Sequence, residues 1–191
     1  EGQVFAVEEE TGRLLWRRYF PGVHISYTSP LYYQDRLLIP QAGLDQGHLR
    51  CLDAATGALL WEALFNGSPG WARQSPPLVY KNLAIYMSST GKYGPTAPEK
   101  ATWLFGSGTF PGSFHPLVRA YDLDSGEEVW TADFSQYGSG GDDAGLCLMD
   151  GKLFYACCFG YDKRTKSAPH DVVAALDPQT GKVLWLTTKY P

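Results

Sequence analysis

Apolar and polar residues alternate along most of the chain in short runs that end at glycine, proline or acidic residues. Such alternation places successive side chains on opposite faces of an extended strand, and Gly, Pro and Asp favour the turns between strands. No apolar run reaches the roughly 18 residues that a membrane-spanning helix needs. The pattern therefore predicts an all-β chain of many short strands.

One hairpin pattern occurs four times without gaps, over residues 6–16, 51–61, 120–130 and 175–185. Each copy has an acidic residue at its third position, Thr-Gly or Ser-Gly at its sixth and seventh, and Trp at its last. A carboxylate can accept hydrogen bonds from backbone amides two residues ahead, and Gly supplies a positive φ. Each copy therefore predicts a β-hairpin with a large indole on its second strand.

A second pair of predicted strands precedes three of these hairpins, at 29–33 and 36–39, 75–80 and 83–87, and 146–149 and 153–157. Each such unit is a four-stranded antiparallel propeller blade. The prediction for residues 1–191 is a partial β-propeller: a hairpin of an incomplete blade at 2–20, then blades at 28–65, 75–134 and 142–188. Because about three and a half blades cannot close a ring, we expect the rest of a ring of seven or eight blades as a partner, in the same or another chain.

The pattern Ala-x-Asp-x-x-Thr-Gly-x-x-x-Trp resembles the tryptophan-docking motif of pyrroloquinoline-quinone-repeat propellers. That family contains quinoprotein dehydrogenases and non-enzymatic relatives such as the outer-membrane assembly lipoprotein of Gram-negative bacteria. The resemblance extends over essentially the whole chain and implies a periplasmic or extracellular location. It also implies that each motif Trp packs on the glycine turn of a neighbouring blade, which assigns structural roles to Trp16, Trp61, Trp130, Trp185, Gly12, Gly57, Gly126 and Gly181.

Composition and cysteine spacing argue against some classes of function, such as nucleic-acid binding and zinc binding. The chain is 44% apolar and 14% aromatic, which is typical of a folded protein, and its net charge of −4 offers no basic surface for a nucleic acid. The cysteines at 51, 147, 157 and 158 lack the paired spacing of a zinc site, and no metal site is predicted. Cys51 lies in a strand pattern, so we expect it to be a buried free thiol.

Antiparallel alternation places the short turns of every blade on one rim and the long connections on the other. Three long connections lead into the innermost strands, and their side chains suit a small polar ligand or a cation. The alternative is ordinary rim polarity with turn glycines, a turn role in the case of the two aspartates. The candidate residues are His24, Tyr27, Trp71, Arg73, Gln74, Asp142 and Asp143.

An aromatic insertion at 90–115 interrupts the second complete blade. Its candidate binding residues are Trp103, Phe105 and Phe110. A loop of this length could cap the axial opening or offer anchors to a partner protein, and the alternative is a self-packed Ω-loop.

The resemblance also raises an enzymatic alternative. Quinoprotein alcohol dehydrogenases hold the quinone over the axis with a calcium ion and an aspartate base, and several stack a disulfide of adjacent cysteines on it. Here Cys157-Cys158 ends a strand and is followed by Phe-Gly-Tyr-Asp, unlike the family context. We therefore expect reduced or structural thiols, no catalytic residue and no cofactor.

These observations favour a non-catalytic scaffold that binds a protein through its long-loop rim. Two alternatives remain open. The first is a fragment of a pyrroloquinoline-quinone- and calcium-dependent alcohol or sugar dehydrogenase, and the second is a propeller that binds a small ligand or glycan. Fold alone does not decide among them.

Overall fold

The computed structural model describes residues 2–21, 29–42, 47–65, 76–88, 117–137, 145–159 and 170–188. These residues form strands and one 3-10 turn, η2 (Ser135–Tyr137). The strands are β1 (Gln3–Val7), β2 (Leu14–Tyr19), β3 (Leu31–Tyr33), β4 (Arg36–Ala42), β5 (Gly47–Asp53), β6 (Leu59–Phe65), β7 (Leu78–Tyr80), β8 (Leu83–Ser88), β9 (Leu117–Asp122), β10 (Glu128–Asp133), β11 (Gly145–Met149), β12 (Lys152–Phe159), β13 (His170–Leu176) and β14 (Val183–Thr187).

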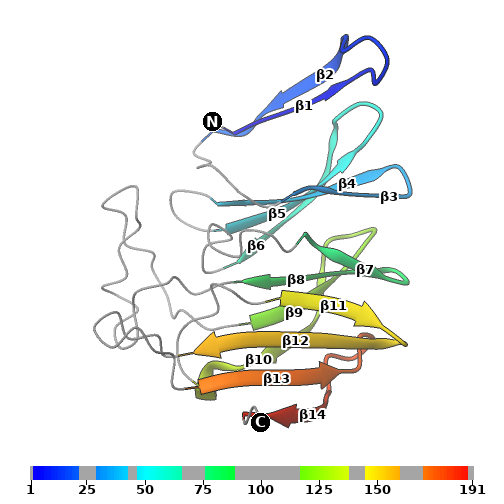
Figure 1. Ribbon diagram of the computed structural model, residues 1–191. Helices are drawn as coiled ribbons and strands as arrows, with labels where there is room; N and C mark the ends of the chain where they lie inside the picture. Colours follow the sequence, from blue (N-terminus) through cyan, green and yellow to red (C-terminus); the bar gives the residue numbers. More distant parts are fainter. Residues whose placement is uncertain are drawn as a thin grey trace, which may run out of the picture.

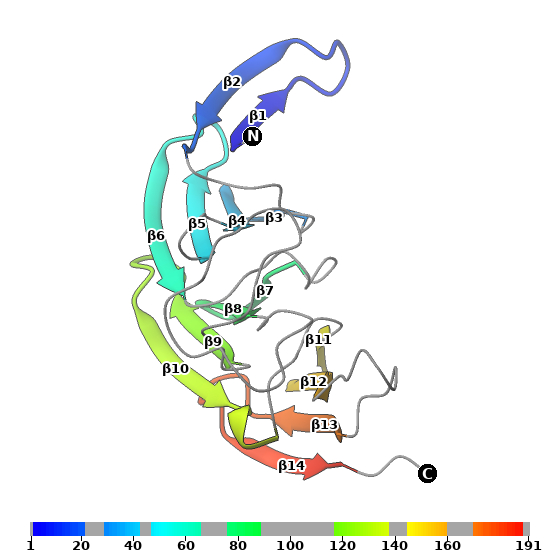
Figure 2. The same ribbon diagram turned by 90° about the vertical axis from the view of Figure 1, so that its left-hand side faces the viewer.

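The strands pair in chain order. β1 and β2 form a two-stranded antiparallel sheet, and β3–β6, β7–β10 and β11–β14 each form a four-stranded sheet. Figure 1 shows the sheets as successive layers, and Figure 2 shows β2, β6, β10 and β14 on the convex side of an arc with β3, β7 and β11 inside it. The molecule is a partial β-propeller, and the predicted all-β fold of four-stranded blades is confirmed.

Each blade contributes both faces to the core, because alternate residues of one strand point to opposite neighbours. On β4, Ile39 faces the β1–β2 hairpin, whereas Leu38 faces the β7–β10 sheet. The same division recurs on β5, where Leu52 and Cys51 are both fully buried but belong to different clusters. The hydrophobic core is thus a series of layers between blades.

The outer hairpins share one turn geometry. The turn glycines at 12, 57, 126 and 181 have φ between +69° and +75°, a left-handed conformation that favours glycine. Each outer pair also has a register shift at the first two residues of the motif, for example between Cys51 and Leu52. Such a bulge increases strand twist, which gives the outer strand the curvature visible in Figure 2.

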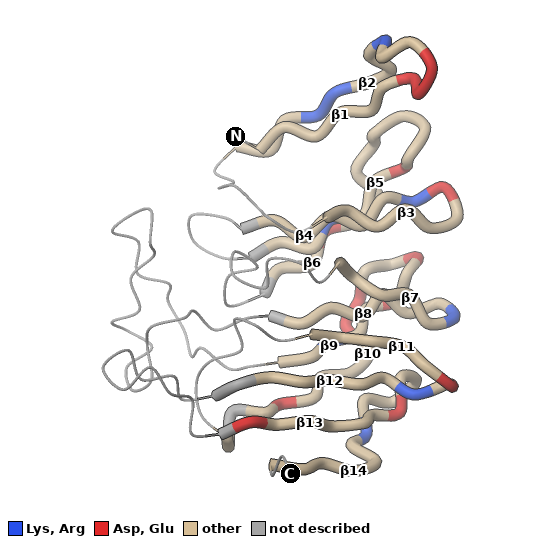
Figure 3. Tube along the Cα trace, viewed as in Figure 1, with Lys and Arg blue, Asp and Glu red and all other residues tan. Residues whose placement is uncertain are grey.

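The turns of the inner strand pairs lie on the same rim as the motif turns. Gln34 and Asp35 both have positive φ, as do Asp150 and Gly151, which is the signature of tight hairpin turns. Figure 3 shows many of the charged residues, acidic ones above all, gathered along this turn rim. The connections longer than six residues all join strand ends on the opposite rim, as alternation of strand direction requires.

Candidate functional site

The ten predicted binding residues, His24, Tyr27, Trp71, Arg73, Gln74, Trp103, Phe105, Phe110, Asp142 and Asp143, lie outside the described residues. What the structure does describe is the set of strand ends that carry them. The segment at 89–116 joins β8 to β9, and the segments at 22–28, 66–75 and 138–144 lead into the innermost strands β3, β7 and β11. The predicted binding residues are therefore attached to one rim of the scaffold, which we call the loop rim.

The motif tryptophans form the joints between blades. A β-carbon built on Gly57 would lie 2.5 Å from Cε3 of Trp16, one on Gly126 would lie 2.6 Å from Cδ2 of Trp61, and one on Gly181 would lie 2.4 Å from Cε3 of Trp130. These distances leave no room for any side chain on the turn. Each of these indoles lies flat against the turn of the next blade, and each is less than a tenth exposed.

Hydrogen bonds fix the orientation of each docked indole. Nε1 of Trp16 donates to the Ala54 carbonyl at 2.9 Å, and Nε1 of Trp61 donates to the Leu123 carbonyl at 2.9 Å. Nε1 of Trp130 donates to the Pro178 carbonyl at 3.2 Å. The acceptor is the fourth residue of the motif each time, so the same indole contact recurs at all three joints.

The motif carboxylates support these turns from within. Asp53 Oδ1 accepts hydrogen bonds from the backbone N–H of Thr56 at 2.8 Å and from its hydroxyl at 2.6 Å. These bonds lower the pKa of Asp53, and equivalent bonds from Ser125 lower the pKa of Asp122. Asp177 accepts from the backbone N–H groups of Gln179 and Thr180. The repeated acidic residue is thus committed to turn structure.

Trp185 and Gly12 depart from the docking expectation. Trp185 pairs with Ala175 in the register that the other motif tryptophans show, yet its side chain is 46% exposed and contacts Phe154. Gly12 has the same positive φ as the docked turns, but no atom lies within 4 Å of the β-carbon position. The reason is that no described strand lies beyond β14 or before β1 to supply the other half of the joint.

Arginines at the blade interfaces were not anticipated. Arg18 donates from Nε to the Gly57 carbonyl at 2.8 Å and from Nη2 to the Thr56 carbonyl at 3.0 Å, beside the Trp16 joint. Arg36 forms an ion pair with Asp124, which links β4 to the turn of the following blade. Both arginines satisfy groups on the adjacent turn, so they reinforce the docking of the indoles.

Arg50 is the one described cation with a nearly buried side chain, 7% exposed. Its Nη2 lies 2.6 Å from Glu62 Oε1, its Nη1 donates to Gln41, and the guanidinium lies 4.4 Å from the ring centroid of Phe20. His48 Nδ1 lies 2.9 Å from the same Glu62 oxygen. Burial lowers the pKa of Arg50 and Glu62 opposes the shift.

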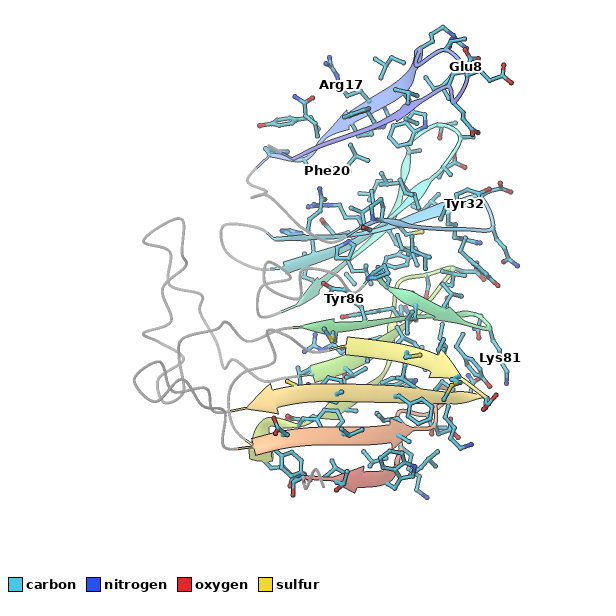
Figure 4. All side chains as sticks on the ribbon, viewed as in Figure 1. Glu8, Arg17, Phe20, Tyr32, Lys81 and Tyr86 are labelled. Atoms are coloured by element: carbon cyan, nitrogen blue, oxygen red, sulfur yellow. The ribbon has the colours of Figure 1, made fainter. Side chains whose placement is uncertain are left out.

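Figure 4 shows Phe20 on the side of the β1–β2 hairpin that faces the β3–β6 sheet, and Arg17 on the other side. Arg50 is part of that sheet, on β5. One sequence signal could have indicated the position. Arg50 and Arg119 each stand immediately before a hairpin motif, where alternation places them on a face between blades.

Two cysteines on central strands have described side chains, Cys51 and Cys157, and both are structural. Cys51 is a fully buried free thiol, as predicted, and burial raises its pKa to about 11. Cys157 is a buried thiol that is part of no disulfide, packs in the core between β7–β10 and β11–β14, and shares a hydrogen bond with Tyr155. This environment does not fit a disulfide of adjacent cysteines stacked on a cofactor.

The described residues hold no group of three or more His, Cys, Asp or Glu side chains arranged to bind a metal ion. Nor do they include a helix whose length and hydropathy would let it cross a membrane.

A repeated docking motif on four-stranded blades can be compared with known families. The sequence matches the family described as outer membrane protein assembly factor BamB (PQQ_2), over residues 1–99 and 115–189. The chain belongs to this family. The match to the BamB family includes all four hairpin motifs, and it confirms the resemblance drawn from them. No curated protein matches the chain.

Solved structures similar to this BamB-family chain include proteins of two kinds. Quinohemoprotein alcohol dehydrogenase from Comamonas testosteroni superposes with a TM-score of 0.65 at 16% identity, over 99% of this chain and 32% of that one. A europium-containing methanol dehydrogenase gives 0.62 at 17% identity, over 99% and 38%. BamB from Moraxella catarrhalis gives 0.51 at 18% identity, over 99% and 56%.

At these identities the similarity establishes the fold alone. The chain spans between about a third and just over half the length of these relatives. Because non-enzymatic and enzymatic proteins both carry the fold, the activity of this BamB-family chain depends on its own residues.

Proposed function

We propose that this chain is part of a non-catalytic propeller of the cell envelope that acts as a protein-interaction scaffold and binds its partner through the loop rim. The observation that carries the proposal is that the repeated motif residues are used for structure at the turn rim, whereas the long connections belong to the loop rim. On the turn rim, the indoles of the repeat hold neighbouring blades together, as in the Trp61–Leu123 hydrogen bond, and its carboxylates hold the turns, as in the Asp53–Thr56 hydrogen bond. The long connections and their aromatic residues belong to the other rim.

A rigid scaffold with long connections on one side is the usual arrangement of a binding surface. The blades here are joined by three docked tryptophans and continuous apolar layers, so the strand ends at the loop rim are held at fixed spacing. Aromatic residues such as Trp103, Phe105 and Phe110 are the types that dominate binding energy at protein interfaces. The family description, an outer membrane assembly factor, supports a protein partner and a periplasmic location.

The test is a comparison of alanine variants on the two rims. Trp71→Ala and Trp103→Ala should each reduce, at least tenfold, the proteins that the folded chain captures from an envelope extract and that mass spectrometry identifies. Tyr32→Ala is the matched control, because Tyr32 is an exposed aromatic residue on β3 next to the turn rim. Capture that is unchanged in both loop-rim variants, or reduced equally by Tyr32→Ala, would refute the proposal.

A quinoprotein oxidoreductase is the second candidate, because two of the structural neighbours described above are alcohol dehydrogenases. Among the described residues no group of three or more His, Cys, Asp or Glu side chains is arranged to bind a metal ion, and Cys157 faces the core between blades, so a quinone and calcium site would draw on other residues. Addition of pyrroloquinoline quinone with calcium separates the candidates. A rise in melting temperature at saturating cofactor would favour the dehydrogenase, and no rise is expected for the scaffold.

A further inference from the structure

The polar group around Arg50 lies at the loop-rim end of the joint between the β1–β2 hairpin and the β3–β6 sheet. Arg50 and His48 lie near the start of β5 and Gln41 near the end of β4, where both strands reach the loop rim. Phe20 directly follows β2, and the guanidinium lies over its ring. Phe20 also packs against the cluster of Trp16, which forms the turn-rim end of the same joint. The joint therefore has two points of attachment, an indole on one rim and a charged group on the other.

Three atoms of this group lie within hydrogen-bond distance of one another. Arg50 Nη2 lies 2.6 Å from Glu62 Oε1 and 3.1 Å from His48 Nδ1. His48 Nδ1 in turn lies 2.9 Å from the same Glu62 oxygen. The histidine side chain is 14% exposed and that of Glu62 is 32% exposed, so water does not readily replace these contacts. An imidazole nitrogen either accepts through its lone pair or donates a proton. Nδ1 can therefore serve only one of its two neighbours at a time.

The protonation state of His48 decides which neighbour that is. When the ring is neutral with its proton on Nε2, Nδ1 accepts from Arg50 Nη2, whose second N–H remains with Glu62. When the ring is charged, Nδ1–H donates to Glu62, and the contact with Arg50 brings two positively charged donors to 3.1 Å. Histidine is the side chain whose charge ordinarily changes between pH 5 and pH 8.

We propose that His48 is a pH-sensitive switch that sets the position of the Arg50 guanidinium and, through Phe20, the fit of the β1–β2 hairpin on the β3–β6 sheet. In the neutral state, Nη2 is held by Glu62 and His48, and Nη1 by Gln41. In the charged state, His48 repels the guanidinium and competes with it for the single oxygen Oε1 of Glu62. The guanidinium then moves, and because Phe20 lies against it, the loop-rim end of the joint is repacked.

The surroundings of the histidine contain few other charges. Among the described residues, the charged groups that contact its ring are Arg50 on β5 and Glu62 on β6. Strand β4 supplies the uncharged Gln41, and the hairpin supplies the apolar ring of Phe20. Arg18 of the hairpin is directed to carbonyls of the turn rim instead. The switch thus acts within the described chain, and it goes beyond the proposed partner binding without resting on it.

The next joint along the chain is a natural control. Arg119 on β9 occupies the position that Arg50 occupies on β5, but Leu117 stands where His48 stands. That joint also contains a docked indole, Trp61. It therefore has the arginine and the tryptophan of the first joint without the histidine.

The test is nuclear magnetic resonance of the isotope-labelled 191-residue chain between pH 5 and pH 8. The indole N–H signals of Trp16 and Trp61 are assigned from Trp16→Phe and Trp61→Phe, and the Arg50 Nε–H signal from Arg50→Lys. The signals of Arg50 and Trp16 should move in one transition with the same midpoint as the ring protons of His48. The Trp61 signal should not follow that transition.

His48→Asn separates the switch from a merely structural role. Its amide oxygen can accept from Arg50 as Nδ1 does, but it takes up no proton in this range. The Arg50 and Trp16 signals should therefore stay at their high-pH positions throughout. His48→Gln serves the same purpose if His48→Asn does not fold, and far-ultraviolet circular dichroism checks each variant.

The proposal is overturned if the signals of Arg50 and Trp16 do not change while His48 titrates. It is also overturned if their transition persists in the variant without the histidine, or if Trp61 shows the same transition as Trp16.

Discussion

Trp61 and Gly126 are separated by more than sixty positions in the sequence, yet the indole lies so close to the turn that a β-carbon on Gly126 would be 2.6 Å from Cδ2. Trp61 Nε1 also donates to the carbonyl of Leu123 in the same turn. Two blades are therefore joined by one side chain that needs both the absence of a side chain opposite and a correctly placed acceptor. Substitution of either residue therefore tests the contribution of the joint to stability.

The first prediction concerns the indole itself. Trp61→Ala should lower the free energy of unfolding by about 3–5 kcal/mol, because it removes a buried aromatic side chain and leaves a cavity between blades. Trp185→Ala should cost only about 1 kcal/mol, because Trp185 is half exposed and packs chiefly on Phe154. Urea unfolding of the two variants at low protein concentration measures the difference, and equal losses would contradict the role assigned to the joint.

The second prediction concerns the glycine opposite. Gly126→Ala and Gly151→Ala both force a left-handed alanine, which costs about 1–2 kcal/mol. Only Gly126→Ala also displaces an indole, so it should cost about 1–3 kcal/mol more. The same unfolding measurement compares the pair. If the two variants prove equally stable, the close approach of Trp61 to Gly126 does not contribute to the free energy of unfolding.

The third prediction is an acid-side loss of stability from the motif carboxylate. Hydrogen bonds from Thr56 lower the pKa of Asp53 in the folded chain. Its contribution is therefore complete above its unfolded pKa of about 3.9 and is lost as the pH falls through the lower folded value. Asp53→Asn keeps an acceptor but does not titrate, so its unfolding free energy should fall less between pH 6 and about pH 3.

Thr56→Val provides the companion variant for that experiment. It removes the hydroxyl donor and leaves the backbone N–H bond to Asp53 in place. We expect an acid dependence intermediate between those of the unchanged chain and Asp53→Asn. Identical pH profiles for all three chains would show that this turn does not couple protonation to folding.

The fourth prediction separates the cysteines by reactivity. Cys51 is fully buried and burial raises its pKa to about 11, so at pH 8 only about one thiol in a thousand is ionised. Cys147 is exposed on β11. A chain that keeps only Cys147 should react with a thiol reagent within minutes, and one that keeps only Cys51 should react only after addition of denaturant. Comparable rates in the folded chains would contradict the burial of Cys51.

The fifth prediction addresses the buried arginine. Glu62→Ala leaves the Arg50 guanidinium without its anion in a largely dry site, and should cost about 1.5–3 kcal/mol. Glu128→Ala is the matched control, since Glu128 lies 3.6 Å from Arg119 and is about half exposed; its loss should cost under about 1 kcal/mol. Denaturant unfolding at pH 7 decides the order, and a larger effect at Glu128 would contradict the account of Arg50.

Local chemistry was enough to predict the blades. The Asp53, Thr56 and Gly57 positions specify a turn, the alternating residues on either side specify strands, and four copies of the pattern specify a repeated blade. These elements depend on contacts within a few residues, such as the bonds between Asp53 and Thr56, so the sequence carries them in readable form.

Contacts between blades needed the tertiary structure. The carbonyl that accepts from each indole, the ion pair of Arg36 with Asp124, and the group around Arg50 join residues from separate strands or blades, and no local pattern states which partner is met. Trp61 and Trp185 also differ in burial for a reason that the local sequence does not contain. The two residues occupy identical motif positions, but a joint exists only where a second blade stands opposite, because burial is a property of the pair of surfaces rather than of either sequence.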